Sequence, residues 1–170
     1  MKKILIIAVL IFVGLNANGF AQKQQKYRKI SEMITDSQRV GGLLAGLLGG
    51  NSAASGNLET TSLSAVNFPN SVKVKYTGET RKISKPRKKA VDTWLKEYAK
   101  QSDARKFYVN EIEVEENGVR YWIMAHENNV IAKLKSSAKK NDEVVLKLKI
   151  LGYSKKGDTT DYFLLSDSVE

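Results

Sequence analysis

The 170-residue chain carries 28 Lys and Arg against 18 Asp and Glu, a formal charge of +10, and contains no cysteine. The lack of cysteine excludes disulfides and thiolate metal sites, so a folded domain must be stabilised by burying apolar side chains, which about 100 residues can do. The positive charge favours anionic partners such as lipid head groups, phosphorylated glycans or nucleic acid.

The first 21 residues have the pattern of a secretory signal peptide. Two lysines precede an apolar run from Ile4 to Leu15, and Gly19-Phe20-Ala21 is a small-x-small cleavage site. The run is shorter than the roughly 20 residues that span a bilayer. We therefore expect cleavage near Ala21, a periplasmic or secreted product, and no transmembrane span in the mature chain. Two lysines and no acidic residue would be removed, which leaves a formal charge of +8.

Residues 22–70 are predicted to form a flexible or partly helical N-terminal extension. Ile30, Met33 and Ile34 recur at helical spacing, which indicates a short helix from about Ser31. Residues 51–70 are rich in Ser, Ala, Thr, Asn and Gly, a composition typical of a linker.

Between these two parts lies the sequence GGLLAGLLGG, residues 41–50. Its glycines recur every four residues, a spacing that lets helix backbones approach closely, although glycine disfavours a helix in water by about 1 kcal/mol per residue. A flexible linker, a contact with a partner, and insertion into a membrane surface all remain open as interpretations. The residues of such a contact would be Gly42, Leu43, Leu44, Gly46, Leu47, Leu48 and Gly50.

Residues 71–170 are predicted to form the compact domain. Residues 71–77 alternate apolar and polar side chains as a half-buried strand does. Residues 86–100 follow as an amphipathic helix that begins at Pro86, with Trp94 and Tyr98 in its buried stripe. The polar face of this helix would carry Arg87, Lys88, Lys89, Lys96 and Lys100.

A hairpin is predicted next, with arms at residues 107–115 and 119–126 around the turn residues Asn117 and Gly118. The apolar phase of the first arm changes midway, which predicts a bulge near Asn110. A short amphipathic stretch at 128–140 and strands at 143–153 and 161–166 complete the domain.

The chain is therefore expected to be mainly β with short helices, an α+β protein. Its hairpin at Asn117-Gly118, the segment Val130 to Ala138 and the run Lys140-Asn141-Asp142-Glu143-Val144 resemble OB-fold domains. The resemblance implies a five-stranded Greek-key barrel with a short helix between its third and fourth strands, and a binding role. The helix at 86–100 and Asn at position 141, where Gly is commoner, depart from that pattern.

Candidate catalytic residues are few. His126 is the only histidine and has no cysteine nearby, so we expect no metal and no cofactor. Three glutamates would share one face of the first hairpin arm, where a pair such as Glu111 and Glu113 could act as acid and base on a glycan. An exposed, solvated strand face is the simpler interpretation of this acidic cluster: Glu111, Glu113, Glu115 and Glu116.

No nucleophile elbow or phosphate-binding loop occurs in the sequence. Lysines interleaved with aromatic residues could bind single-stranded nucleic acid, but an exported protein would not meet it. Because the lysines are spread through most segments, solubility is the simplest interpretation of the charge. We expect a non-enzymatic binding or envelope-associated module that binds an anionic envelope component or itself; the alternative is a small hydrolase of envelope glycans that uses Glu111 or Glu113.

Overall fold

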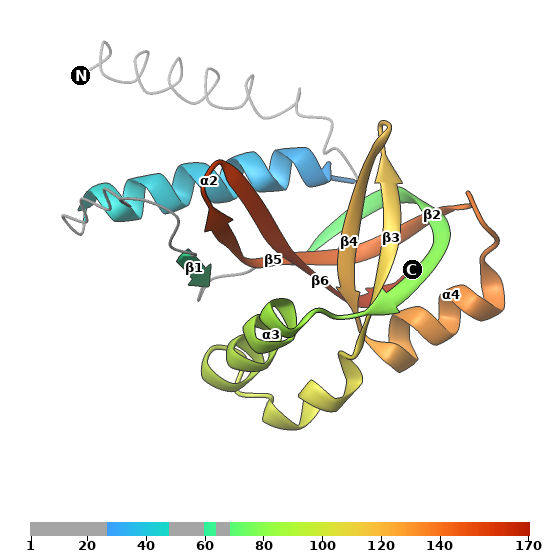
Figure 1. Ribbon diagram of the computed structural model, residues 1–170. Coiled ribbons are helices and arrows are strands. Elements are labelled where there is room, and N and C mark those ends of the chain that lie inside the picture. Colours follow the sequence, from blue (N-terminus) through green and yellow to red (C-terminus); the bar gives the residue numbers. More distant parts are fainter. Residues whose placement is uncertain (1–26, 48–59, 64–68) are drawn as a thin grey trace, which may run out of the picture.

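The structure, a computed structural model, describes residues 27–47, 60–63 and 69–170 (Figure 1). Its helical elements are α2 (Ile30–Leu47), α3 (Lys85–Glu97), the 3-10 helix η1 (Ser102–Phe107), the π-helical turn η2 (Glu127–Ile131) and α4 (Ala132–Ser137). Its strands are β1 (Thr60–Leu63), β2 (Asn70–Lys82), β3 (Asn110–Glu116), β4 (Val119–Ala125), β5 (Glu143–Lys156) and β6 (Thr159–Val169).

Strands β2 to β6 form a closed five-stranded sheet. The order is β5-β2-β3-β4-β6, and pairing of β6 with β5 closes it. All neighbours are antiparallel except β4 and β6, which run parallel. The predicted mainly β composition with short helices is confirmed, and this arrangement is compatible with an OB-like fold. Strand β1 lies outside the closed sheet and pairs with the end of β5.

Strand β2 bends so that it can pair with β5 along its first half and with β3 along its second half. The register shifts between Tyr76 and Thr80, and Gly78 within this bulge has a φ of +85°, which glycine adopts without the steric cost that other residues meet. The pairing of β5 with β6 has two further shifts, one between Lys147 and Leu148 and one between Ile150 and Gly152. These irregularities bend the strands and thereby allow the sheet to close on itself.

The hairpin of β3 and β4 has the predicted turn but lacks the predicted bulge. Asn117 and Gly118 have φ values of +53° and +81°, as a two-residue hairpin turn requires. The register runs without a shift from Asn110 opposite Ala125 to Glu116 opposite Val119, so the prediction of a bulge near Asn110 was wrong. The apolar phase changes there because Phe107 belongs to η1 and the strand starts only at Asn110.

The interior of the closed sheet is covered by a helical element at each end of the β3–β4 hairpin. Val130, Ile131 and Leu134 of η2 and α4, which follow the open end, are buried against the sheet's apolar side chains. Ile30 and Met33 of α2 join the same core, and α2 starts beside Glu116 at the turn of the hairpin. The structure thus includes part of the predicted N-terminal extension in the core.

Helix α3 packs on the outside of the sheet, below it in Figure 1, and builds a second apolar cluster. Val91, Trp94 and Leu95 are buried there against side chains of the sheet: Met124, Leu151, Phe163 and Leu165. The predicted burial of Trp94 is confirmed. Tyr98 was wrongly assigned to the buried stripe; it is 43% exposed because the helix ends at Glu97.

The start of α2 is capped by a strand residue far away in the sequence. The buried carboxylate of Glu116 accepts hydrogen bonds from the backbone N–H groups of Ile30 (2.9 Å) and Ser31 (3.4 Å). Helix N-termini have unpaired N–H groups and a partial positive charge, so a carboxylate there satisfies both. An isolated bridge between Arg28 and Val72 holds the preceding residues beside β2.

Replacing Glu116 by Ala is expected to lower the free energy of unfolding by about 1–3 kcal/mol, because buried N–H groups of α2 lose their acceptor. Glu116→Gln should lose less, since its amide oxygen still accepts one bond. Urea unfolding measures both changes. The matched control is Glu115→Ala, one residue earlier on the other face of β3, which should stay within about 0.5 kcal/mol. A similarly small loss for Glu116→Ala would show that α2 is held without this cap.

Candidate binding surface

The acidic cluster of β3 is buried, which overturns the prediction that it forms an exposed strand face. Glu111 is 0% exposed, and Glu113 and Glu116 are each 8% exposed. Glu115 alone in this cluster is half-buried. The prediction that three of these glutamates share one face of the strand was correct. That outer face of β3, however, lies against side chains of the α3 segment and of β2 rather than against water.

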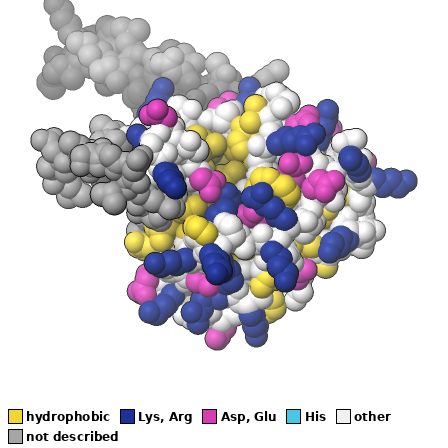
Figure 2. Space-filling model, in the orientation of Figure 1, with side chains coloured by type: hydrophobic (Ala, Val, Ile, Leu, Met, Phe, Trp, Pro, Cys, Tyr) yellow, Lys and Arg dark blue, Asp and Glu magenta, His cyan; other side chains and the backbone are white. Residues whose placement is uncertain are grey.

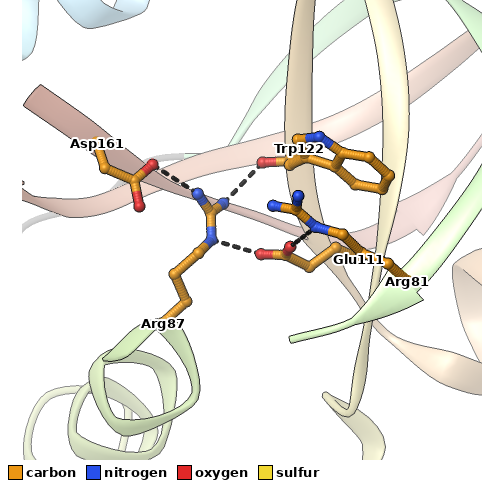
Figure 3. Close-up of polar contacts among 5 residues, drawn as sticks. All are labelled: Arg81, Arg87, Glu111, Trp122 and Asp161. Atoms are coloured by element: carbon orange, nitrogen blue, oxygen red, sulfur yellow. Dashed lines mark hydrogen bonds and ion pairs between the residues drawn. The ribbon is translucent and has the colours of Figure 1, made fainter. Parts of the chain in front are cut away.

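Arg87 of α3 reaches across to the sheet and binds three groups at once (Figure 3). Its Nη1 pairs with Asp161 Oδ1 at 2.7 Å, and its Nη2 donates to the carbonyl oxygen of Trp122 at 2.7 Å. Its Nε forms an ion pair with Glu111 Oε1. The side chain is only 6% exposed, so the prediction that Arg87 belongs to the polar surface of the helix was wrong.

The second oxygen of Glu111 is held by Arg81. The Nε of Arg81 lies 2.8 Å from Glu111 Oε2, and its guanidinium carbon lies 3.9 Å from the ring centroid of Trp122 (Figure 3). Both carboxylate oxygens of this buried side chain therefore face arginines. A charge removed from water in this way is tolerated only when it is paired and hydrogen-bonded, and Glu111 is left with no face that a substrate could reach.

Glu113 is no better placed for catalysis. Its Oε2 lies 3.5 Å from Nη1 of Arg120, and its side chain is 10% exposed. Two open surface depressions are described, of about 400 and 370 Å³, and neither is lined by Glu111 or Glu113. The geometry of this pair therefore provides no access for a glycan between the two carboxylates.

The side chain of His126 packs against aromatic rings and caps a helical turn. Its ring stacks on Phe107 at 4.7 Å and meets Tyr108 edge-on at 5.3 Å, and its Nδ1 accepts a hydrogen bond from the backbone N–H of Asn129 at 3.3 Å. It thereby caps the start of η2. Within the described ranges, no group of three or more His, Cys, Asp and Glu residues lies close enough to hold a metal ion.

A second polar link ties the α3–η1 segment to β5 and β6. The hydroxyl of Tyr108 donates to Asp167 Oδ1, and Lys149 pairs with Asp167 Oδ2 while lying 5.7 Å from the ring centroid of Trp94. Burial raises the pKa of Tyr108 well above its usual range, and the charge of Asp167 adds to this effect. Tyr108 thus remains a neutral donor and holds the end of the segment in place.

The positive charge is concentrated in the segment that contains α3 and η1. Residues 82–106 hold nine Lys and Arg against three Asp and Glu, whereas the other described residues hold fifteen against fourteen. Lysines do occur in most segments, as the sequence shows, but the net positive charge is not evenly distributed: most of it lies in this one segment. Figure 2 shows several Lys and Arg side chains over the lower part of the molecule, where Figure 1 places α3, and others elsewhere on this face.

Three lysines form a stripe on the outer side of α3. At 3.6 residues per turn, Lys85, Lys89 and Lys96 fall within about 40° of one another, directly opposite the buried residues around Trp94. All three are exposed. Lys96 pairs with the exposed Glu97 at 3.0 Å, an interaction that water and salt weaken. We call these three residues the lysine stripe.

The glycine-leucine contact stays a prediction. Gly42, Leu43, Leu44, Gly46 and Leu47 fall in the last turns of α2, but their side chains lie outside the described part of the structure, as do Leu48 and Gly50 altogether. Just before this block, the side chain of Gln38 on α2 donates a hydrogen bond to the hydroxyl of Tyr162 on β6. Among the described residues, no helix is long and apolar enough to cross a membrane.

Comparison of this chain with protein-family models, with curated proteins and with solved structures finds no match.

Replacing one member of the buried pair Arg87–Glu111 should destabilise the fold much more than replacing both members with apolar residues. Arg87→Met and Glu111→Leu are each expected to lower the free energy of unfolding by about 3–5 kcal/mol, because each removes one ionic partner from a buried charge and leaves Glu111 with Arg81 alone, or Arg87 with Asp161 alone. The double variant Arg87→Met, Glu111→Leu should lose less than the sum of the two. Urea unfolding gives all three values.

Lys85→Met, an exposed change on the same helix, is the control and should stay within about 0.5 kcal/mol. Additive losses in the double variant would mean that Arg87 and Glu111 do not stabilise the fold as a pair.

Proposed function

We propose that the chain is an exported, non-enzymatic binding module for an anionic component of the cell envelope. Export is supported by the signal-like pattern of residues 1–21. The binding role is supported chiefly by the charge of residues 82–106, which hold nine Lys and Arg but only three Asp and Glu. A local charge excess of this size raises the concentration of anionic partners near that surface.

We also infer that the closed sheet is an OB-like Greek-key barrel. Its support is the strand order, the single parallel pair β4–β6, and the position of η2 and α4 between the third and fourth strands of the closed sheet. OB domains bind ligands on the face of their second and third strands and on adjacent loops. Here part of that outer face is packed against α3, since Met124 of β4 lies in the second apolar cluster. The ligand of this chain would therefore bind on the outer surface of α3 instead.

A hydrolase that uses Glu111 or Glu113 has little physical support. A general acid or base must reach the substrate within hydrogen-bond distance, whereas Glu111 is fully buried between two arginines and Glu113 faces Arg120. Binding without turnover is the function that this geometry favours.

The processed chain recovered after export is expected to bind anionic probes and not neutral ones. Suitable probes are long-chain inorganic polyphosphate, a polyuronate and vesicles that contain phosphatidylglycerol, with dextran as the neutral control. Binding should weaken as salt is added, because exposed charges are screened within about 8 Å at physiological ionic strength. Calorimetry measures binding, and chromatography of the probes detects cleavage.

Mass spectrometry of the same sample checks cleavage near Ala21. Two results would contradict the proposal: no binding to any anionic probe at low salt, or release of glycan fragments that is lost in Glu113→Gln.

The glycine-leucine block is proposed as a contact for self-association at the end of α2. Replacing Leu43, Leu44, Leu47 and Leu48 by Ser should then shift the processed chain to the monomer in sedimentation, because the apolar contact is lost. The melting temperature should not change if these leucines lie outside the core. A monomeric parent chain would leave the block as a linker, and a fall of several degrees in the variant would mean that the leucines pack on the domain.

A further inference from the structure

We infer that the outer surface of α3 and η1 docks on an anionic lipid surface through the lysine stripe. This inference rests on the proposed function, since it names the surface and the partner for the same binding role.

The shape of the charged surface fits an extended partner. The lysine stripe lies along the outermost side of a helix and spans about 16 Å at 1.5 Å per residue. None of its three lysines lines either of the two depressions described above. The nearby depression between α3 and η1 is open and is lined by both cations and acids: Lys88, Asp92, Ser102, Asp103, Arg105, Lys106 and Val109. A compact anion would find few converging donors here, whereas a flat layer of phosphate head groups can meet all three lysines.

Apolar side chains accompany the cations on this side of the molecule. Val109, which lines the depression, is 42% exposed, and Pro86 beside Lys85 is exposed as well. Arg105 and Lys106 of η1 add two exposed cations next to Val109. A soluble polyanion would use the charges alone, but a lipid interface also accepts exposed apolar groups. The combination favours a membrane surface over a soluble polymer.

The contact is peripheral because α3 cannot turn its apolar face to the lipid. Val91, Trp94 and Leu95 are buried in the second cluster, and Arg87 fixes the first turn to Glu111 and Asp161. The α3–η1 segment has only three acidic residues that could repel an anionic surface. Asp92 pairs with Lys88 and Glu97 pairs with Lys96, and Asp103 is the third. Docking should therefore be electrostatic, reversible and sensitive to salt.

The test compares two triple variants of the processed chain with the same change in net charge. One is Lys85→Glu, Lys89→Glu, Lys96→Glu in the lysine stripe; the matched control is Lys133→Glu, Lys135→Glu, Lys139→Glu on and after α4, whose lysines are exposed too. Binding is measured by flotation with vesicles of phosphatidylcholine and phosphatidylglycerol, and with vesicles of phosphatidylcholine alone. Thermal melting checks that both variants fold.

The stripe variant is expected to lose at least about 100-fold in affinity for the anionic vesicles, because three attractive charges near the membrane surface are lost and the new glutamates add repulsion. The α4 variant should keep most of its affinity, and no protein should float with neutral vesicles. Equal losses in both variants would overturn the inference, because net charge alone would then explain binding.

If the parent chain binds polyphosphate but not anionic vesicles, the lipid partner is wrong while the proposed function stands. If it binds no anionic probe at all, both fail. If the stripe variant melts much lower than the parent, Lys85→Gln, Lys89→Gln, Lys96→Gln replaces it, and undiminished vesicle binding by that variant would also overturn the inference.

Discussion

The position of α3 depends on one buried ion pair, that of Arg87 with Glu111. Two charges leave water here, and their cost is offset only because Asp161, Arg81 and the carbonyl oxygen of Trp122 supply further partners. The pair lies at the first turn of α3 and sets its orientation, while the apolar stripe around Trp94 is buried in the second cluster and adds hydrophobic stabilisation. With that side fixed to the sheet, the opposite side must face out, and this is where the lysine stripe lies.

The other glutamates of β3 act in a related way. Glu116, at the turn end of the strand, holds the first N–H groups of α2, and Glu113 pairs with Arg120 on the neighbouring strand. Strand β3 thus anchors one helix through Glu111 and another through Glu116, on opposite faces and at opposite ends. Acidic residues that resemble a solvated face in the sequence are here the attachment points of the elements around the sheet.

Local features of the sequence predicted the elements well, and long-range contacts explain the errors. The Asn117-Gly118 turn, the strand alternation and the start of α3 near Pro86 depend on neighbouring residues and were correct. Burial of Glu111 and Glu116 depends on partners 30 and 86 residues away, which no periodicity reveals. The bulge was expected in the wrong strand because Phe107 was counted as part of β3, whereas Gly78, which bends β2, gave no signal beyond being a glycine. The charge excess in residues 82–106 could have been counted directly, since it needs no structure.

The concentration of charge in one segment also separates two roles within the domain. Outside residues 82–106 the described residues hold fifteen cations against fourteen acids, so the closed sheet and its two covering helices are nearly neutral. A nearly neutral scaffold repels itself little, and its exposed ion pairs contribute little to stability. The α3–η1 segment bears almost all of the excess and is fixed at both ends, by Arg87 at its start and by Tyr108 after its end. A flexible basic loop would lose conformational entropy when it bound an anionic surface. A helix already held in place avoids most of that cost, so each lysine of the stripe can contribute more of its attraction to binding.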